Sequence, residues 1–156
     1  MGVTAGTDYA IARKTTWIFP GAGIGPATAV LTRRTLFLFP HRAFSGHGNV
    51  RSRTTFTIGG QSPVVAIEAL LAAPDTTPDG LEAQLRRWAA DVQGPVVEDL
   101  QAYLRVRVFT GWLRRSVAFS KKASGYDLRP ESVRPTKLEL PAFLTLLSDR
   151  PGVEIK

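Results

Sequence analysis

The chain has 156 residues, 44% of them hydrophobic, no cysteine and a formal net charge of +7 at pH 7. This length and apolar content predict a single globular domain over residues 1–156 with a core of its own. The lack of cysteine excludes a disulfide scaffold and every thiolate-ligated zinc or iron–sulfur site. The N-terminus does not resemble a secretory signal and no apolar run approaches the ~20 residues that cross a bilayer, which predicts a cytoplasmic protein.

The first third of the chain has the residue pattern of β-strands. Bulky residues alternate over residues 8–19, and a second apolar pattern covers 27–39, with a glycine- and proline-rich segment at 20–26 between them. This arrangement predicts a long β-hairpin, in which Arg33-Arg34 marks a bend or an exposed edge. A third strand is expected over residues 50–58.

The middle of the chain changes to helical patterns. Ser62-Pro63 and Thr77-Pro78 each combine an N-cap residue with proline at the first helical position, which predicts one helix over residues 64–71 and another after Pro78. The second helix carries a one-sided apolar stripe that is expected to be buried. This stripe consists of Leu81, Leu85, Trp88, Ala89 and Val92.

Acidic residues of this second helix, Asp79, Glu82 and Asp91, lie on the face opposite the stripe and are expected in solvent. Pro95 opens a third predicted helix, because the apolar residues over 96–104 keep helical spacing.

The last third returns to strands and ends in a helix. Residues 104–112 fit either a strand or a continued helix, and their β-branched and aromatic side chains favour the strand. A further strand is expected over 113–121, an irregular loop over 121–136, a short extended segment over 138–140 and a last helix from Pro141.

This order of elements predicts an α+β fold. The expected architecture is an antiparallel β-sheet or a small barrel, with a helical insertion at about residues 62–104 and a C-terminal helix.

No residue pattern assembles an active site. The glycines of 21–26 lack the spacing and the following helix of a phosphate-binding loop, and His41 and His47 have too few carboxylates nearby to complete a metal site. The adjacent Glu98 and Asp99 point to different sides of the expected helix. We therefore expect no metal, no cofactor and no catalysis, with an enzyme of non-obvious site as the third hypothesis.

The charge is distributed in blocks, with net +6 over residues 1–67, −5 over 68–104, +7 over 105–137 and −1 over 138–156. The basic blocks either form a surface for a polyanion or are neutralised by the acidic segment. A third explanation of the basic blocks is an arginine-rich composition that has no functional role. The candidate anion-binding residues are Arg33, Arg34, Arg42, Arg51, Arg53, Arg114, Arg115, Lys121 and Lys122.

Aromatic residues lie near these basic clusters, a combination that suits a membrane surface or single-stranded nucleic acid. Core packing is the expected role for most of them, including Phe37, Phe39, Phe56 and Trp112. The favoured hypothesis is a non-catalytic binding module for an anionic membrane surface or a protein partner. The alternative is a nucleic-acid-binding protein.

A short motif resembles a known family. Leu31-Thr32, followed by the apolar run 36–39, is similar to a hairpin of pleckstrin-homology-like domains of the GRAM type, and residues 116–120 before the C-terminal helix fit the same pattern. The resemblance covers about a third of the chain, and the family does not require a helical insertion at 62–104. It implies a small barrel or sandwich that binds lipids or proteins.

Overall fold

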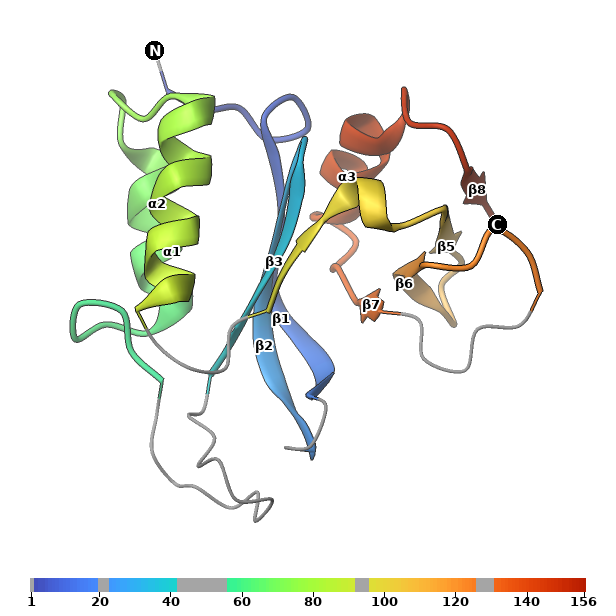
Figure 1. Ribbon diagram of the computed structural model, residues 1–156, viewed down its shortest axis with the longest axis horizontal. Coiled ribbons are helices and arrows are strands. Elements are labelled where there is room, and N and C mark those ends of the chain that lie inside the picture. The colour runs from blue at the N-terminus through green and yellow to red at the C-terminus, as the bar shows by residue number, and fades with distance from the viewer. Residues whose placement is uncertain (1, 20–22, 42–55, 92–95, 126–130) are drawn as a thin grey trace.

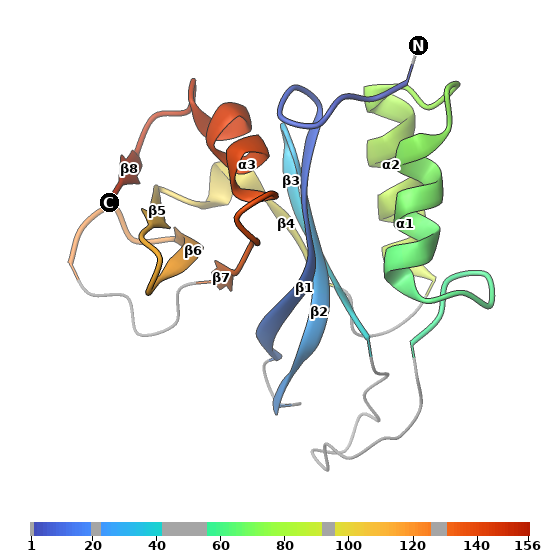
Figure 2. The ribbon, with the colours of Figure 1, turned by 180° about the vertical axis from the view of Figure 1, so that it is seen from behind.

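The computed structural model describes residues 2–19, 23–41, 56–91, 96–125 and 131–156. Its elements form three layers, with a first β-sheet in the middle, as Figures 1 and 2 show from opposite sides. Two helices cover one face of this first sheet, and a second sheet with a third helix covers the other. The α+β fold expected from the sequence is confirmed.

The first sheet has the strand order β1-β2-β3-β4 and is antiparallel throughout. The first two strands form the predicted hairpin, but β2 begins at Gly23, within the segment 20–26 that was expected to be a loop. The register between the two strands shifts between Ala12 and Thr15. Arg33-Arg34 is a two-residue turn that divides the predicted second strand into two. The strands are β1 Tyr9–Phe19, β2 Gly23–Thr32, β3 Thr35–Pro40 and β4 Val96–Asp99.

Strand β3 is buried on both faces, which explains its uninterrupted apolar sequence. Leu36 and Leu38 point into the core shared with the second sheet, whereas Phe37 and Phe39 point into the core beneath the helices. The helices α1 (Pro63–Ala72) and α2 (Pro78–Ala90) lie side by side over this second core.

Both helices begin at the predicted residues. The side chain of Ser62 accepts a hydrogen bond from the backbone of Val65, and the side chain of Thr77 accepts one from Gly80. Leu81 and Leu85 are fully buried. Trp88 is only half-buried, because it lies at the rim of the α1–α2 layer and lines a groove there; Val92 lies outside the described residues.

The second sheet has the order β7-β6-β5-β8. Its strands pair antiparallel except β5 with β8, which are parallel. Both sheets are open, so the small-barrel alternative is not the form adopted. The elements are β5 Arg105–Thr110, β6 Arg115–Ser120, β7 Glu131–Val133, the helix α3 Leu140–Leu147 and β8 Val153–Ile155.

The predicted third helix after Pro95 is wrong. Residues Val96–Asp99 form β4, which pairs with the free edge of β3, and a 3-10 turn, η1, follows at Leu100–Ala102. Val96 and Val97 pack on opposite faces of the sheet, one into each core. A place at a sheet edge therefore outweighs the helical spacing of the apolar residues.

Three smaller expectations also need correction. Residues 138–140 are not extended, because a turn precedes α3 and the helix begins at Leu140. The expected loop over 121–136 contains β7, and β8 follows α3 without having been predicted. The third strand expected over 50–58 lies mostly outside the described residues, and Phe56–Ile58 contributes only an isolated bridge.

Among the described residues no helix is long and apolar enough to cross a bilayer.

Candidate surface at the tip of the β5–β6 hairpin

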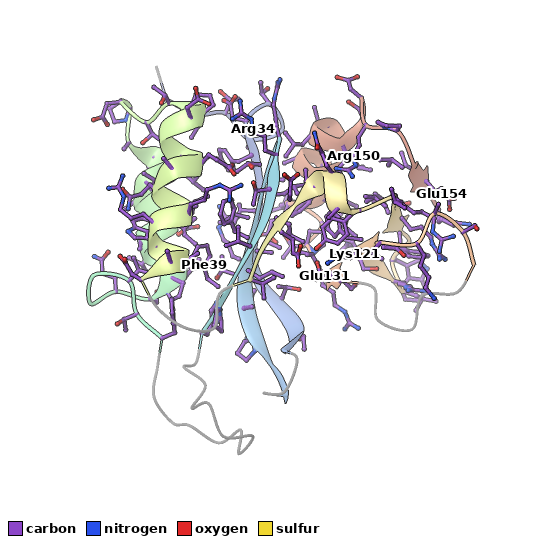
Figure 3. All side chains as sticks on the ribbon, in the orientation of Figure 1. Arg34, Phe39, Lys121, Glu131, Arg150 and Glu154 are labelled. Atoms are coloured by element: carbon purple, nitrogen blue, oxygen red, sulfur yellow. The ribbon has the colours of Figure 1, made fainter. Side chains whose placement is uncertain are left out.

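The structure distributes the candidate basic residues over separate parts of the molecule. Arg33 and Arg34 form the β2–β3 turn, whereas Arg114 and Arg115 lie at one end of β6 and Lys121 and Lys122 follow its other end. Figure 3 shows Arg34 at the end of the first sheet and Lys121 well away from it. Arg42, Arg51 and Arg53 lie outside the described residues.

Several of these cations have protein partners. Arg34 lies 3.8 Å from Asp79, with both side chains exposed. Lys121 donates a hydrogen bond of 3.3 Å to Glu98 and lies over the ring of Tyr103. Pairs of this kind reduce the charge available to an external anion, so these positions are weaker candidates than the sequence suggests.

The β5–β6 turn combines two basic with two apolar side chains. The strands pair up to Thr110 and Arg115, which leaves residues 111–114 as a protruding turn. Trp112 is 86% exposed and Leu113 81% exposed. Residues 111–115 are called the hairpin tip below.

The side chains of β5 alternate between the core and the outer face of the sheet. Val106 and Val108 point inward and are buried, and each faces an apolar partner on β6 in the core between the sheets. Phe109 points to the outer face, where the guanidinium of Arg114 lies 3.8 Å from its ring centroid. This cation–π contact holds Arg114 against the strand beside the two exposed apolar side chains.

The basic residues of the hairpin tip have no acidic partner within ion-pair distance among the described residues. Glu154, on the strand β8 that pairs with β5, lies opposite Arg107 and 3.9 Å from Lys156. The positive charge of Arg114 and Arg115 is therefore not offset by a close carboxylate in the part of the chain described.

A second group of ionisable side chains lies between the sheets, at β7. Glu131 faces the buried Phe119 across the β6–β7 pair, and its Oε2 atom is buried without a hydrogen-bond partner among the described residues. Burial, and then the charge of Glu98, raises the pKa of Glu131 to about 7. The hydroxyl of Tyr103 is also buried and has no hydrogen-bond partner in the part of the chain that the structure describes. Figure 3 shows Glu131 and Lys121 in this region.

The structure describes one of the two histidines, His41. The Nε2 atom of His41 lies 2.7 Å from the hydroxyl of Thr28, and burial, followed by the charge of Lys14, lowers its pKa. His47 lies outside the described residues. Among those described, no three His, Asp or Glu side chains gather as a metal-binding group.

Sequence reasoning identified the basic residues of the hairpin tip and misplaced its aromatic residue. Trp112 was expected in the core, yet it lies in the turn, where no strand partner covers it. The signal was the sequence Gly111-Trp112-Leu113 between two strands, because large apolar residues are unusual in a short turn.

Comparison of the chain with protein-family models, curated proteins and solved structures finds no match. The resemblance to pleckstrin-homology-like domains of the GRAM type therefore stays a prediction.

Proposed function

We propose that the protein is a non-catalytic binding module that attaches reversibly to an anionic membrane surface through its hairpin tip. The observation that carries the proposal is the adjacency of two exposed apolar side chains, Trp112 and Leu113, to two arginines without acidic partners among the described residues. Tryptophan suits the headgroup region of a bilayer because its ring has an apolar body and a polar N–H.

The geometry supports a shallow attachment. Apolar side chains that leave water contribute roughly 1.5–3 kcal/mol each when fully buried, and each basic residue near an anionic leaflet contributes about 1 kcal/mol. Contributions of this size resemble those of a single acyl chain, which gives reversible binding. A groove that reads bases would instead require aromatic faces along a basic channel. Beside Trp112 the described hairpin offers Phe109, and its ring is already covered by Arg114.

The test is co-sedimentation with vesicles of phosphatidylcholine alone and of phosphatidylcholine mixed with phosphatidylserine. We expect the wild type to bind the anionic vesicles, less so as salt rises, and to leave the neutral vesicles largely unbound. Replacing Arg114 and Arg115 together by glutamine should weaken binding roughly 10- to 30-fold, since each arginine supplies about 1 kcal/mol. The double change of Trp112 and Leu113 to serine should weaken it at least as much.

Two variants away from the hairpin tip serve as matched controls. Leu138→Ser removes a leucine that is 92% exposed, and Arg87→Gln removes an exposed arginine of α2. Both should bind like the wild type. Equal binding to neutral vesicles, or equal loss in the controls, would contradict the proposal. Preferential binding of oligonucleotides at the same ionic strength would favour the nucleic-acid alternative, and no binding to either would leave a protein partner.

Fluorescence gives a second measurement of the same contact. A tryptophan that enters the headgroup region shifts its emission to shorter wavelength, so anionic vesicles should shift the emission of the wild type. Trp112→Phe should abolish the shift and still sediment with vesicles, because phenylalanine keeps the apolar contact.

A further inference from the structure

A cleft of about 250 Å³ lies where four segments of the chain meet. These segments are the N-terminal turn at Gly6-Thr7, the β2–β3 turn at Arg33, the η1 turn at Leu100 and the end of α3 with the residues after it. Gly6 has a positive φ of 82° and packs on Thr145 of α3, where an added Cβ would lie 3.4 Å from the threonine Cβ. The close approach of this glycine closes one wall of the cleft. The cleft shares no residue with the hairpin tip.

Arg150 supplies one charged wall of the cleft. Its Nη2 atom donates hydrogen bonds to two backbone carbonyls, those of Leu100 and Tyr103, and the side chain lies beside η1 in Figure 3. These bonds fix one edge of the guanidinium and leave Nε and Nη1 without a protein acceptor among the described residues. Burial lowers the pKa of Arg150, which reflects the cost of holding this charge away from water, and the charge of Asp99 offsets part of that shift.

Arg33 supplies the second charged wall. Its Nε atom donates a hydrogen bond of 2.7 Å to the backbone carbonyl of Thr7, which orients the guanidinium along the rim of the cleft. Its two terminal nitrogens have no acceptor among the described residues. Each arginine is therefore held by backbone carbonyls and keeps donors for another group.

The charge in the cleft is not balanced by an ion pair. Neither Arg33 nor Arg150 has a carboxylate within 4.0 Å among the described residues. Asp149 also lines the cleft, is exposed and makes no such pair. Two guanidinium groups that share a cleft repel each other, and a bound dianion would offset this repulsion while using their remaining N–H groups.

We propose that this cleft binds a phosphate monoester, with Arg33 and Arg150 as the two guanidinium ligands. Bidentate donation from a guanidinium matches the spacing of phosphate oxygens, and two arginines match the charge of a dianion. Leu100, Leu146 and Leu147 also line the cleft, on the side where the group that carries the phosphate would lie. Asp149 weakens the site and sets its affinity by repelling the anion.

The first test measures thermal unfolding of the full chain with added inorganic phosphate, compared with chloride at the same ionic strength. Phosphate that binds the folded state raises the unfolding temperature. Arg33→Gln should weaken phosphate binding roughly tenfold, because a charge-assisted hydrogen bond is lost. Asp149→Asn should strengthen it by about two- to fivefold, since it removes one exposed like charge. Arg150→Gln also removes structural hydrogen bonds, so the test relies on the other two variants.

Arg34→Gln is the matched control, because Arg34 is the neighbour of Arg33 in the same turn and does not line the cleft. It should respond to phosphate like the wild type. The proposal is overturned if the wild type gains no stability from phosphate, if Arg33→Gln gains as much as the wild type, or if Asp149→Asn binds more weakly.

Two further probes test whether the site accepts the monoester from solution, from a membrane surface, or from both. Glycerol 3-phosphate presents the monoester in solution, and vesicles with phosphatidic acid present it on a membrane. Both are expected to compete with inorganic phosphate in the wild type and to fail in Arg33→Gln. The Trp112 and Leu113 double variant should retain binding of glycerol 3-phosphate, which separates this site from the proposed function of the hairpin tip. Competition that persists in Arg33→Gln would overturn the assignment.

Discussion

The first sheet with its helices and the second sheet use their charged residues in different ways. In the first, Arg13 and Glu82 take part in networks that join the layers. Arg13 lies at the irregularity in β1, where its guanidinium contacts Glu68 of α1 and Glu139 at the start of α3. Glu139 is buried and also accepts a hydrogen bond from the backbone of Thr136. This network joins elements from both faces of the sheet.

A similar network closes the β2–β3 turn. Glu82 of α2 accepts hydrogen bonds from the hydroxyls of Thr32 and Thr35. Arg86 forms an ion pair with Glu82 and donates a hydrogen bond to the hydroxyl of Thr35. The side chain of Glu82 is only 13% exposed, so the expectation that it lies in solvent is wrong.

The second sheet leaves comparable groups without partners. Within the described residues, Glu131 and Ser116 each have a buried side-chain oxygen without a hydrogen bond, and the arginines of the hairpin tip have no carboxylate within ion-pair distance. Satisfied polar networks fix a structure, whereas unsatisfied groups cost stability and are retained where they serve another purpose. The comparison supports the proposal that the hairpin tip of the second sheet is the membrane-binding surface, with the networks of the first sheet as its scaffold.

The largest expected effect compares the scaffold with the surface through one substitution in each. Leu85 of α2 is fully buried, and Leu113 at the hairpin tip is 81% exposed. Leu85→Ala should lower the free energy of unfolding by about 2–5 kcal/mol, because it leaves a cavity. Leu113→Ala should change it by less than about 0.5 kcal/mol. Denaturant unfolding monitored by circular dichroism measures both, and a comparable loss in Leu113→Ala would show that the hairpin tip is packed.

An intermediate effect is expected at the network that joins the layers. Glu139→Gln keeps the shape of a side chain that is 6% exposed and removes its charge toward Arg13. We expect a loss of about 1–3 kcal/mol, the usual cost of weakening hydrogen bonds to a buried charged group. Glu68→Gln changes the other partner of Arg13, which is 44% exposed, and should cost less than about 1 kcal/mol. Urea unfolding measures both losses. If the two variants lose the same free energy of unfolding, the buried contact of Arg13 with Glu139 contributes no more than its exposed contact with Glu68.

Local signals in the sequence were sufficient for the helices and for most strands. The caps at Ser62 and Thr77 and the alternation in β5 and β6 depend on neighbours along the chain. Strand β4 was missed because Val96, Val97 and Leu100 have helical spacing, and only the free edge of β3, distant in sequence, decides their conformation.

The candidate site was predicted in composition and not in arrangement. Arg114 and Arg115 were identified as a basic pair, but residue type does not show that Trp112 is exposed, because most tryptophans are largely buried. Arg150 was missed because its proposed role depends on hydrogen bonds to the backbone carbonyls of Leu100 and Tyr103. Leu100 lies 50 residues before Arg150 in the sequence. Both features arise from tertiary contacts that a single sequence does not encode locally.

The smallest of these effects on stability concerns Glu131, and its sign depends on pH. The folded state raises the pKa of this carboxyl from 4.5 to about 7, so the folded protein binds a proton that the unfolded chain has released. The contribution of Glu131 to stability is therefore fully present below pH 4.5 and declines as pH rises to about 7. Glu131→Gln imitates the protonated form and should raise the free energy of unfolding above pH 7 by about 1–2 kcal/mol, allowing for partial solvent screening.

This gain should disappear as the pH falls below 4.5, because the wild-type carboxyl is then protonated as well. Glu154→Gln on β8, whose side chain is 49% exposed, is the matched control and should show no comparable dependence on pH. Urea unfolding across this pH range measures the difference between each variant and the wild type. A stability change in Glu131→Gln that is the same at every pH would mean that Glu131 is not held in a desolvated site. In that case the second sheet would be as well satisfied as the first, and the division into scaffold and binding surface would lose one of its supports.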